Sequence, residues 1–329
     1  MLDKVYEQSL NLVVKAAYYY YTSGLSQSEI SELLGVSVPT VSRLLKKARD
    51  KRIVQFHIPE HFSNCISLES ELKKELGLRE VIISPNTRDI TDTDIKKNVA
   101  MEGARYIQRL IKPEDVLGIA WGRTMYYLIH YLNPSQKIEA SFVALHGSIS
   151  DVVDDLDTQS LVSRVSMAFG GHRRVFYSKA LGHSPNQLTE YWKSKSGNTI
   201  LKAFSEITIS ISGVGALYPV WDSPLVNNEF FTKEIKETLQ AHNACADIMT
   251  RFIDKEGNEC DTFLKQTTLG ISLDMYKKIP TKIVVASGQF KANAIMAIAK
   301  GGLVDVLILD YDLATEVQKA LNYGRGAAE

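Results

Sequence analysis

The segment SQSEISELLGVSVPTVSRLLKK, residues 26–47, predicts two short helices joined by a tight turn. Ser26 and Glu29 have the spacing of a capping box, which satisfies free backbone N–H groups where a helix begins. Gly35 suits the left-handed backbone that ends such a helix, and Pro39 is tolerated in the first turn of the next one. This arrangement is typical of a helix-turn-helix, whose second helix enters the major groove of DNA.

The second of these helices has one apolar face and one polar face. Val41, Leu44, Leu45 and Ala48 recur at helical spacing and are expected to face the first helix. The chain is neutral overall, with 38 basic and 38 acidic residues, but residues 43–52 are strongly basic, and phosphate neutralisation needs only such a local patch. A helical hairpin with a solvated basic face is the alternative. The outward residues that we expect to contact DNA are Ser37, Thr40, Ser42, Arg43, Lys46 and Lys47.

The composition places the chain among cytoplasmic globular proteins of two domains. It has 329 residues, of which 45 % are hydrophobic, enough for a large core. No apolar run approaches the roughly 18 residues of a membrane span. The three cysteines are far apart, without the spacing of a metal or redox motif, and are expected to be reduced thiols. No fingerprint of a cofactor or metal site is present, so we expect neither.

Two domains are expected. Residues 1–58 are expected to form an all-α DNA-binding head, with Ile53–Ile58 as a candidate wing strand, and residues 59–66 a linker. From 67 to 329, helices alternate with short apolar strands, which predicts an α/β domain with a mainly parallel sheet. Ligands of such sheets bind outside the carboxyl ends of the strands, where glycine turns follow the expected strands at Gly122, Gly147, Gly213 with Gly215, and Gly288.

Two stretches in this second region, GIAWGRTMYYL at 118–128 and VVASGQFKANAIMAIAKGGLVDVLILD at 284–310, resemble the SorC family of bacterial transcriptional regulators. NACADIMTRFIDKEGN at 243–258 and the helix-turn-helix resemble the same family, in the same order. The resemblance implies an effector-binding and oligomerisation domain related to glucosamine-6-phosphate deaminase and ribose-5-phosphate isomerase. It also implies a phosphorylated sugar as effector and assembly into a homodimer or homotetramer.

Two glycine-bearing turns are candidate phosphate sites. Gly122, Arg123 and Thr124 follow a strand and open a helix, where backbone N–H groups attract anions. Arg123 adds a fork of donors and Thr124 a hydroxyl. Lys291 follows Gly288 in the same context and matches a lysine that the family carries. The alternatives are an ordinary strand-to-helix turn and solvated basic side chains.

Other candidates are suited to sugar hydroxyls. Asp247 matches an acidic residue that accepts hydrogen bonds from sugar hydroxyls in relatives; a helix cap or surface ion pair is the alternative. A relative with lysine at the position of His146 could form an imine with an aldehyde. Histidine cannot, so we expect non-covalent binding, and a purely structural histidine is equally open. The remaining candidates follow nearby: Gly147, Ser148 in place of the second glycine of many relatives, and Gln159.

Taken together, these features predict a cytoplasmic regulator of carbohydrate genes that binds double-stranded operator DNA and responds to a phosphorylated sugar. One alternative is a sugar-phosphate isomerase or deaminase with an added DNA-binding head, although no sequence motif demands catalysis. Another is an interaction scaffold with a vestigial pocket. Turnover on a panel of phosphosugars separates the regulator from the enzyme. A thermal shift on that panel separates the regulator from the scaffold, because a ligand of the folded state raises the melting temperature.

Overall fold

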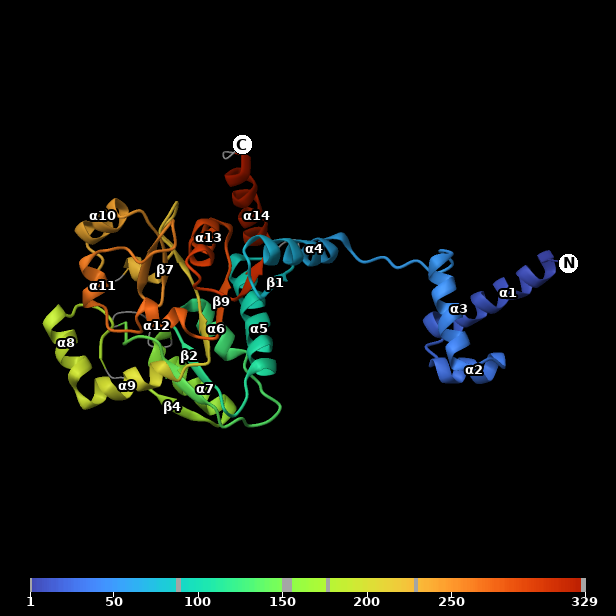
Figure 1. Cartoon of the computed structure of the whole chain (residues 1–329), viewed down its shortest axis with the longest axis horizontal. Helices are drawn as coiled ribbons and strands as arrows, with labels where there is room; N and C mark the ends of the chain where they lie inside the picture. Colours follow the sequence, from blue (N-terminus) through green and yellow to red (C-terminus); the bar gives the residue numbers. More distant parts are fainter. Residues whose placement is uncertain (1, 87–89, 150–155, 176–177, 228–229, 327–329) are drawn as a thin grey trace. The chain divides into compact units, whose positions relative to one another are not determined.

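The computed structural model describes residues 2–86, 90–149, 156–175, 178–227 and 230–326. The chain divides into two compact units, one up to residue 60 and the other from residue 61 onward (Figure 1). None of the helices in the described part of the chain is long and apolar enough to cross a membrane.

The first unit is a helix-turn-helix. It contains α1 (Leu2–Ala17), the π-helix η1 (Tyr18–Thr22), α2 (Gln27–Leu34) and α3 (Val38–Asp50). Ser26 and Glu29 form the expected capping box, and Gly35 ends α2 in the left-handed region at φ +63°. Both helices pack against α1, and the buried side chains form two small clusters: Ala16, Ile30, Val41 and Leu45 in one, and Val13, Ala17 and Ala48 in the other.

The segment after α3 differs from the sequence prediction. Residues 53–58 form no strand, so the predicted wing is absent. Instead, the backbone N–H groups of Ile53 and Val54 donate to the carbonyl of Ala48 at the end of α3, which closes the helix. The physical reason is that residues 2–60 of the first unit include no strand for this segment to pair with, and a lone strand leaves its backbone groups unsatisfied.

The expected linker at 59–66 is also largely helical, because α4 (Glu60–Glu75) begins there. Leu68 and Leu72 of α4 are buried in the core of the second unit. Glu69 accepts a hydrogen bond from the backbone N–H of Ile83, at 2.8 Å. These contacts hold the later part of α4 on the α/β unit.

The second unit is built on a seven-stranded sheet in which every pair of neighbouring strands is parallel. The strand order is β1-β10-β9-β5-β2-β3-β4. Six of these strands overlap the apolar runs from which the sequence predicts strands, and the short β4 was not predicted; the runs are 81–84, 116–120, 140–145, 207–212, 283–286 and 304–309. The bounds are β1 Glu80–Ser84, β2 Val116–Ile119, β3 Ser141–Ala144, β4 His172–Arg174, β5 Ile209–Ser212, β9 Thr281–Ala286 and β10 Val306–Asp310.

Helices cover the sheet because its strands are apolar on both faces. Helices α5 (Asp92–Leu110), α6 (Arg123–His130) and α7 (Thr158–Phe169) pack against their neighbours and the strands, while α13 (Ala292–Lys300) packs on α14 (Tyr311–Gly326) (Figure 1). The other helices are α8 Pro185–Lys193, α9 Lys195–Ser205, η3 Pro224–Asn227, α10 Lys233–Ala241, α11 Phe263–Thr267, α12 Leu273–Lys277 and η4 Gln289–Lys291.

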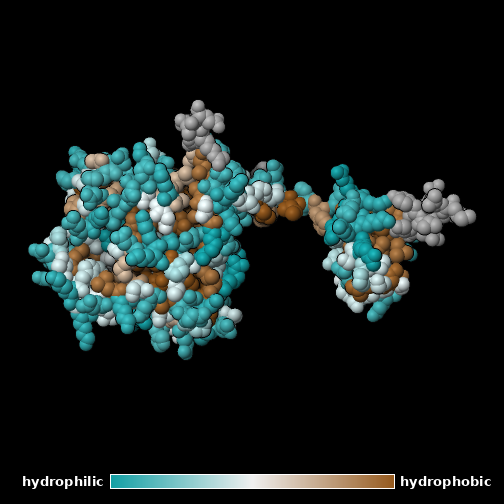
Figure 2. Space-filling model, in the orientation of Figure 1, coloured by the Kyte–Doolittle hydropathy of each residue, from teal (hydrophilic) through white to brown (hydrophobic). Residues whose placement is uncertain are grey.

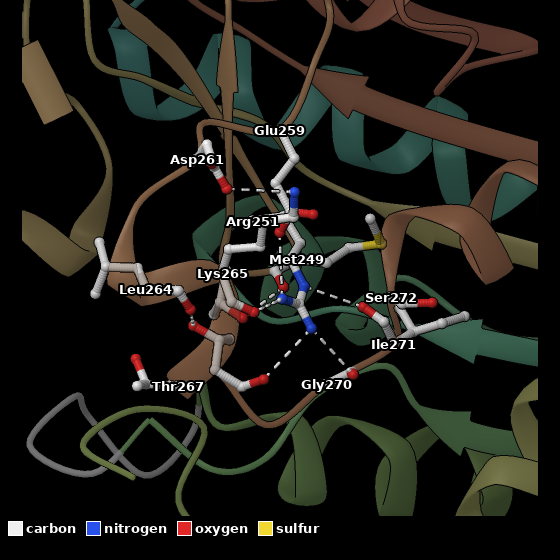
Figure 3. A network of polar contacts seen from close by, with 12 residues as sticks. Met249, Arg251, Glu259, Asp261, Leu264, Lys265, Thr267, Gly270, Ile271 and Ser272 are labelled. Atoms are coloured by element: carbon white, nitrogen blue, oxygen red, sulfur yellow. Dashed lines mark hydrogen bonds and ion pairs between the residues drawn. The ribbon is translucent and has the colours of Figure 1, made fainter. Parts of the chain in front are cut away.

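A second, antiparallel sheet was not predicted. It comprises β6 (Gly215–Ala216), β7 (Ala244–Ile248) and β8 (Arg251–Asp254). The Arg251 side chain is buried and pairs with Glu259 at 3.2 Å, and its other donors reach backbone carbonyls (Figure 3). It thereby fixes the segment from α11 to α12 against β8, with these carbonyls as acceptors: Lys265, Thr268, Gly270 and Ile271.

Candidate effector pocket and DNA-binding helix

A pocket lies at the carboxyl ends of β2 and β5, which are neighbours in the sheet. The connectivity reverses there, because the chain runs from β2 to β3 and β4 on one side and later returns to β5 on the other. Such a switch point opens a crevice between the two loops that leave the strands in opposite directions. The lining residues that carry chemistry are Lys96, Gly122, Arg123, Thr124, Asp222, Asp247 and Lys291.

The turn after β2 presents one side of the pocket. Gly122 has φ +120°, a conformation that only glycine adopts readily, and α6 begins at the next residue. Thr124 is buried and lines the pocket. Arg123 is half-exposed, and its guanidinium lies 3.2 Å from one oxygen of the Asp222 carboxylate.

Lys291 reaches the same carboxylate from the opposite turn. Its ammonium group is 3.3 Å from the other oxygen of Asp222 and donates to the carbonyl of Val214 at 2.9 Å. The side chain is buried, which lowers the pKa of Lys291, while Asp222 acts in the opposite direction. Lys96 of α5 also lines the pocket, and both burial and the nearby Arg123 lower its pKa. Three basic groups, Arg123, Lys291 and Lys96, therefore lie around the Asp222 carboxylate.

Asp247 of β7 also lines the pocket. It is only 5 % exposed, and its Oδ2 accepts a hydrogen bond from Ser223 Oγ at 2.7 Å. Oδ1 accepts no hydrogen bond of normal geometry from the described residues, although the nearby Thr250 N–H favours the ionised form. Burial outweighs these effects and raises the pKa of Asp247 to about 6. A buried carboxylate oxygen without a donor is a ready acceptor for a ligand hydroxyl.

The structure thus brings five predicted effector-site residues to one pocket, and the other four lie outside its lining. His146 is completely buried. Its ring nitrogen Nδ1 lies within hydrogen-bond distance of the carbonyl of Gly147 and of the Thr158 hydroxyl, and the ring packs edge-on against Trp121. Burial lowers the pKa of His146 to about 4, so it is neutral at physiological pH. The role predicted for it in binding a hydroxyl is replaced by a structural one, because the ring points into the core.

The other three predicted residues also have structural environments. A Cβ on Gly147 would lie 2.5 Å from the carbonyl oxygen of Ser178, so glycine is required there for close packing. The Ser148 hydroxyl donates to Asp157, the cap of α7, and accepts from the Gln159 side chain at 3.1 Å. These groups organise the start of α7 rather than the pocket.

Sequence reasoning missed Lys96, Asp222 and Ser223. Lys96 stands in the second turn of a long helix with no motif around it, and it reaches the pocket only because α5 packs beside α6. Asp222 and Ser223 lie in a loop whose sequence, LYPVWDSP at 217–224, carries no recognised pattern. Only the path of this loop after β6 shows that it crosses the pocket.

In the first unit, α3 presents the expected outward face. Ser37, Ser42, Arg43 and Lys46 are exposed, and Thr40 and Lys47 are half-buried. The hydroxyls of Ser37 and Thr40 are 2.9 Å apart at the start of the helix, and Arg43 Nε reaches back to the carbonyl of Pro39. This is an exposed polar and basic helix on a small apolar core, which is the form of a recognition helix.

A helix-turn-helix joined to an α/β unit with a polar pocket at its switch point defines a ligand-responsive DNA-binding regulator. The family model described as "Putative sugar-binding domain" matches residues 60–318, and that of sigma-70 region 4 matches residues 8–51. The chain belongs to the SorC family of sugar-binding transcriptional regulators.

Individual relatives cover nearly the whole chain. The deoxyribonucleoside regulator of Bacillus subtilis (strain 168) is 30 % identical over 305 residues, which are 92 % of this chain and 96 % of that protein. The sorbitol operon regulator of Klebsiella pneumoniae is 26 % identical, covering 93 % of this chain and 96 % of its own. The crystal structure of full-length SorC from Klebsiella pneumoniae superposes with a TM-score of 0.73 at 25 % identity, covering 93 % of this chain and 97 % of that one. These relatives are named as regulators, two of them of an operon.

Proposed function

We propose that this protein is a cytoplasmic transcriptional regulator whose operator affinity is set by a phosphorylated sugar bound in the pocket between β2 and β5. The observation that carries the proposal is that one pocket combines basic side chains with a buried acceptor. Arg123, Lys291 and Lys96 lie around the Asp222 carboxylate, and Asp247 offers a buried oxygen. A phosphosugar carries an anion and several hydroxyl donors, so it complements both kinds of group.

The backbone supports the same assignment. The turn at Gly122 places the free N–H groups of the first turn of α6 at the rim of the pocket, where they favour an anion. Arg123 supplies a forked donor set and Lys291 a buried point charge, while Thr124 adds a hydroxyl. On this proposal Asp247 accepts from sugar hydroxyls, and binding is non-covalent.

The DNA-binding part of the proposal rests on α3. A single recognition helix reads only a few base pairs, so we further propose that the protein acts as a homo-oligomer that places two such helices on one operator. The effector acts by binding the DNA-competent and incompetent arrangements with different affinity, and therefore bound DNA must in turn alter effector affinity.

Isothermal titration with a panel of free sugar phosphates, followed by operator binding measured by fluorescence anisotropy, tests the proposal. We expect one or more phosphosugars to bind wild type, and Lys291→Ala to weaken that binding roughly 10- to 100-fold, because a charged hydrogen bond is lost. Operator affinity without effector should stay nearly unchanged, because Lys291 lies in the other unit.

Lys300→Ala is the matched control, since Lys300 is an exposed lysine on the adjoining helix α13. It should bind the effector like wild type. Equal affinity of wild type and Lys291→Ala would remove Lys291 from the site. Turnover of any phosphosugar on the panel would favour the isomerase or deaminase alternative, and absence of binding across the panel would contradict the sensor function.

A further inference from the structure

The loop between β6 and η3 places an acidic side chain where the anion of a ligand would lie. Each carboxylate oxygen of Asp222 faces a different cation, with Oδ1 3.2 Å from Arg123 and Oδ2 3.3 Å from Lys291. An oxyanion held between these two cations would take the same position. In this structure the basic side chains of the pocket are therefore already neutralised in part by a group of the protein itself.

The next residue, Ser223, contacts the other carboxylate of the pocket, Asp247. Ser223 is buried, and its hydroxyl donates to Asp247 Oδ2 at 2.7 Å, as a sugar hydroxyl would. The loop is held closely against the sheet: the N–H of Asp222 donates to Ala216, and a Cβ on Gly215 would lie 2.8 Å from Ser223 Cβ. Glycine at 215 is therefore what allows the loop to come this close to the pocket.

We propose that the Asp222-Ser223 dipeptide is an internal competitor of the effector, with its carboxylate in the place of the phosphate and its hydroxyl in the place of a sugar hydroxyl. The inference rests on the proposed function of the pocket. The effector must displace Asp222 to reach Arg123 and Lys291, so the loop moves when the pocket fills. Asp222 thereby sets the affinity threshold of the sensor, because the apparent affinity falls with the fraction of molecules in the competent state.

The contacts fit a displaceable competitor. The Asp222 side chain is 23 % exposed, so its ion pairs are partly solvated. One carboxylate also shares its single negative charge between two cations. A phosphate group offers up to two charges and three acceptor oxygens to the same cations, including Lys96. Trp221, directly before Asp222, packs partly buried against the cluster that contains Leu217 and Leu225, so displacement changes the surroundings of its ring.

Inorganic phosphate is the probe, because it tests the basic side chains of the pocket without an identified sugar. Titration calorimetry on the full chain should show that Asp222→Asn binds phosphate about tenfold more tightly than wild type. Glu316→Gln is the matched control: it removes the same charge from an exposed ion pair with Lys319 on α14 and should leave the affinity unchanged. Thermal unfolding of each variant shows that it is folded.

Tryptophan fluorescence separates displacement from a simple effect of charge. Saturating phosphate should shift the emission of wild type but much less that of Trp221→Phe, which identifies Trp221 as the source. Asp222→Asn should show the shifted emission before phosphate is added, because the ion pairs that hold the loop are absent.

The outcomes are distinct for the two proposals. Phosphate that binds wild type but binds Asp222→Asn no more tightly overturns the internal competitor and leaves the effector site standing. Asp222→Asn that binds phosphate more tightly, while phosphate leaves the Trp221 emission of wild type unchanged, also overturns the internal competitor. In that case the loop does not move, and the lost negative charge alone accounts for the higher affinity. If neither protein binds phosphate, the proposed phosphate site fails as well. Tighter binding together with the emission change supports the competitor.

Discussion

At the scale of single residues, the pocket carries charged groups in places where burial makes them unfavourable. Asp247 is 5 % exposed, and its carboxyl has a pKa of about 6 instead of the usual 3.8. Because the folded protein holds this proton more tightly than the unfolded chain, the ionised group costs stability above pH 6. That cost disappears below the unfolded pKa, where the carboxyl is protonated in both states. Because Asp247 lowers the stability of the fold and lines a pocket, we expect its function to be ligand binding.

Asp247→Asn should therefore stabilise the unliganded protein at alkaline pH. We expect a gain on the order of 2 kcal/mol in the free energy of unfolding at pH 8, shrinking as the pH falls from 6 to 4. Urea denaturation across that pH range measures the difference, and the same variant should lose affinity for phosphosugars. The exposed Asp261→Asn is the control without a pH-dependent gain. A gain that is equal at pH 4 and pH 8 would contradict the ionisation argument.

At the scale of elements, α3 combines a buried stripe with an exposed basic face. The stripe fixes its rotation against α1 and α2, and so determines which side chains can meet DNA. Arg43 and Lys46 are both exposed on the outward face but suit different contacts. An arginine fork reads a guanine edge, whereas a lysine ammonium neutralises phosphate.

Arg43→Ala should accordingly weaken binding to the specific operator by about 1–3 kcal/mol and relax its sequence preference. Lys46→Ala should weaken specific and non-specific DNA more evenly and lower the slope of log affinity against log salt by about one. Fluorescence anisotropy over a salt series measures both effects. Lys15→Ala, an exposed lysine on α1, serves as control. Unchanged operator affinity in both folded variants would remove α3 from the DNA interface.

At the scale of the whole molecule, large apolar side chains are exposed to solvent near the start of α4. Ile66 and Phe62, four residues apart on this helix, are 58 % and 44 % exposed. Figure 2 shows brown, hydrophobic residues along this stretch, while most of the visible surface is hydrophilic. Exposed apolar groups that lie together indicate contact with another protein. In the proposed homo-oligomer, a second copy of this chain makes that contact.

We expect light scattering at micromolar concentration to give a dimer or tetramer, and Ile66→Ser to shift it toward the monomer. Because a dimer holds two recognition helices at fixed spacing, the same variant should weaken operator binding without altering phosphosugar binding. Tyr323→Ser, at an exposed position on α14, is the control. A wild-type monomer that binds its operator one to one would contradict oligomerisation.

The sequence by itself determined those features that depend on local rules. Caps, a left-handed glycine and helical periodicity predicted α2 and α3, and short apolar runs that alternate with helical segments predicted six strands of the parallel sheet. The turn at Gly122 and its neighbours Arg123 and Thr124 were predicted because strand, glycine and helix follow one another directly in the chain.

Tertiary structure alone decided which of these groups meet. Asp222 lies 99 residues from Arg123 in the chain, and their contact depends on how the loop after β6 folds back across the switch point. His146 follows a strand end as Arg123 does, yet its ring turns into the core against Thr158. The predicted wing failed for a related reason, since a strand exists only where a partner strand lies beside it. Local propensity is written within a few residues, but contacts between distant segments depend on how the whole chain packs.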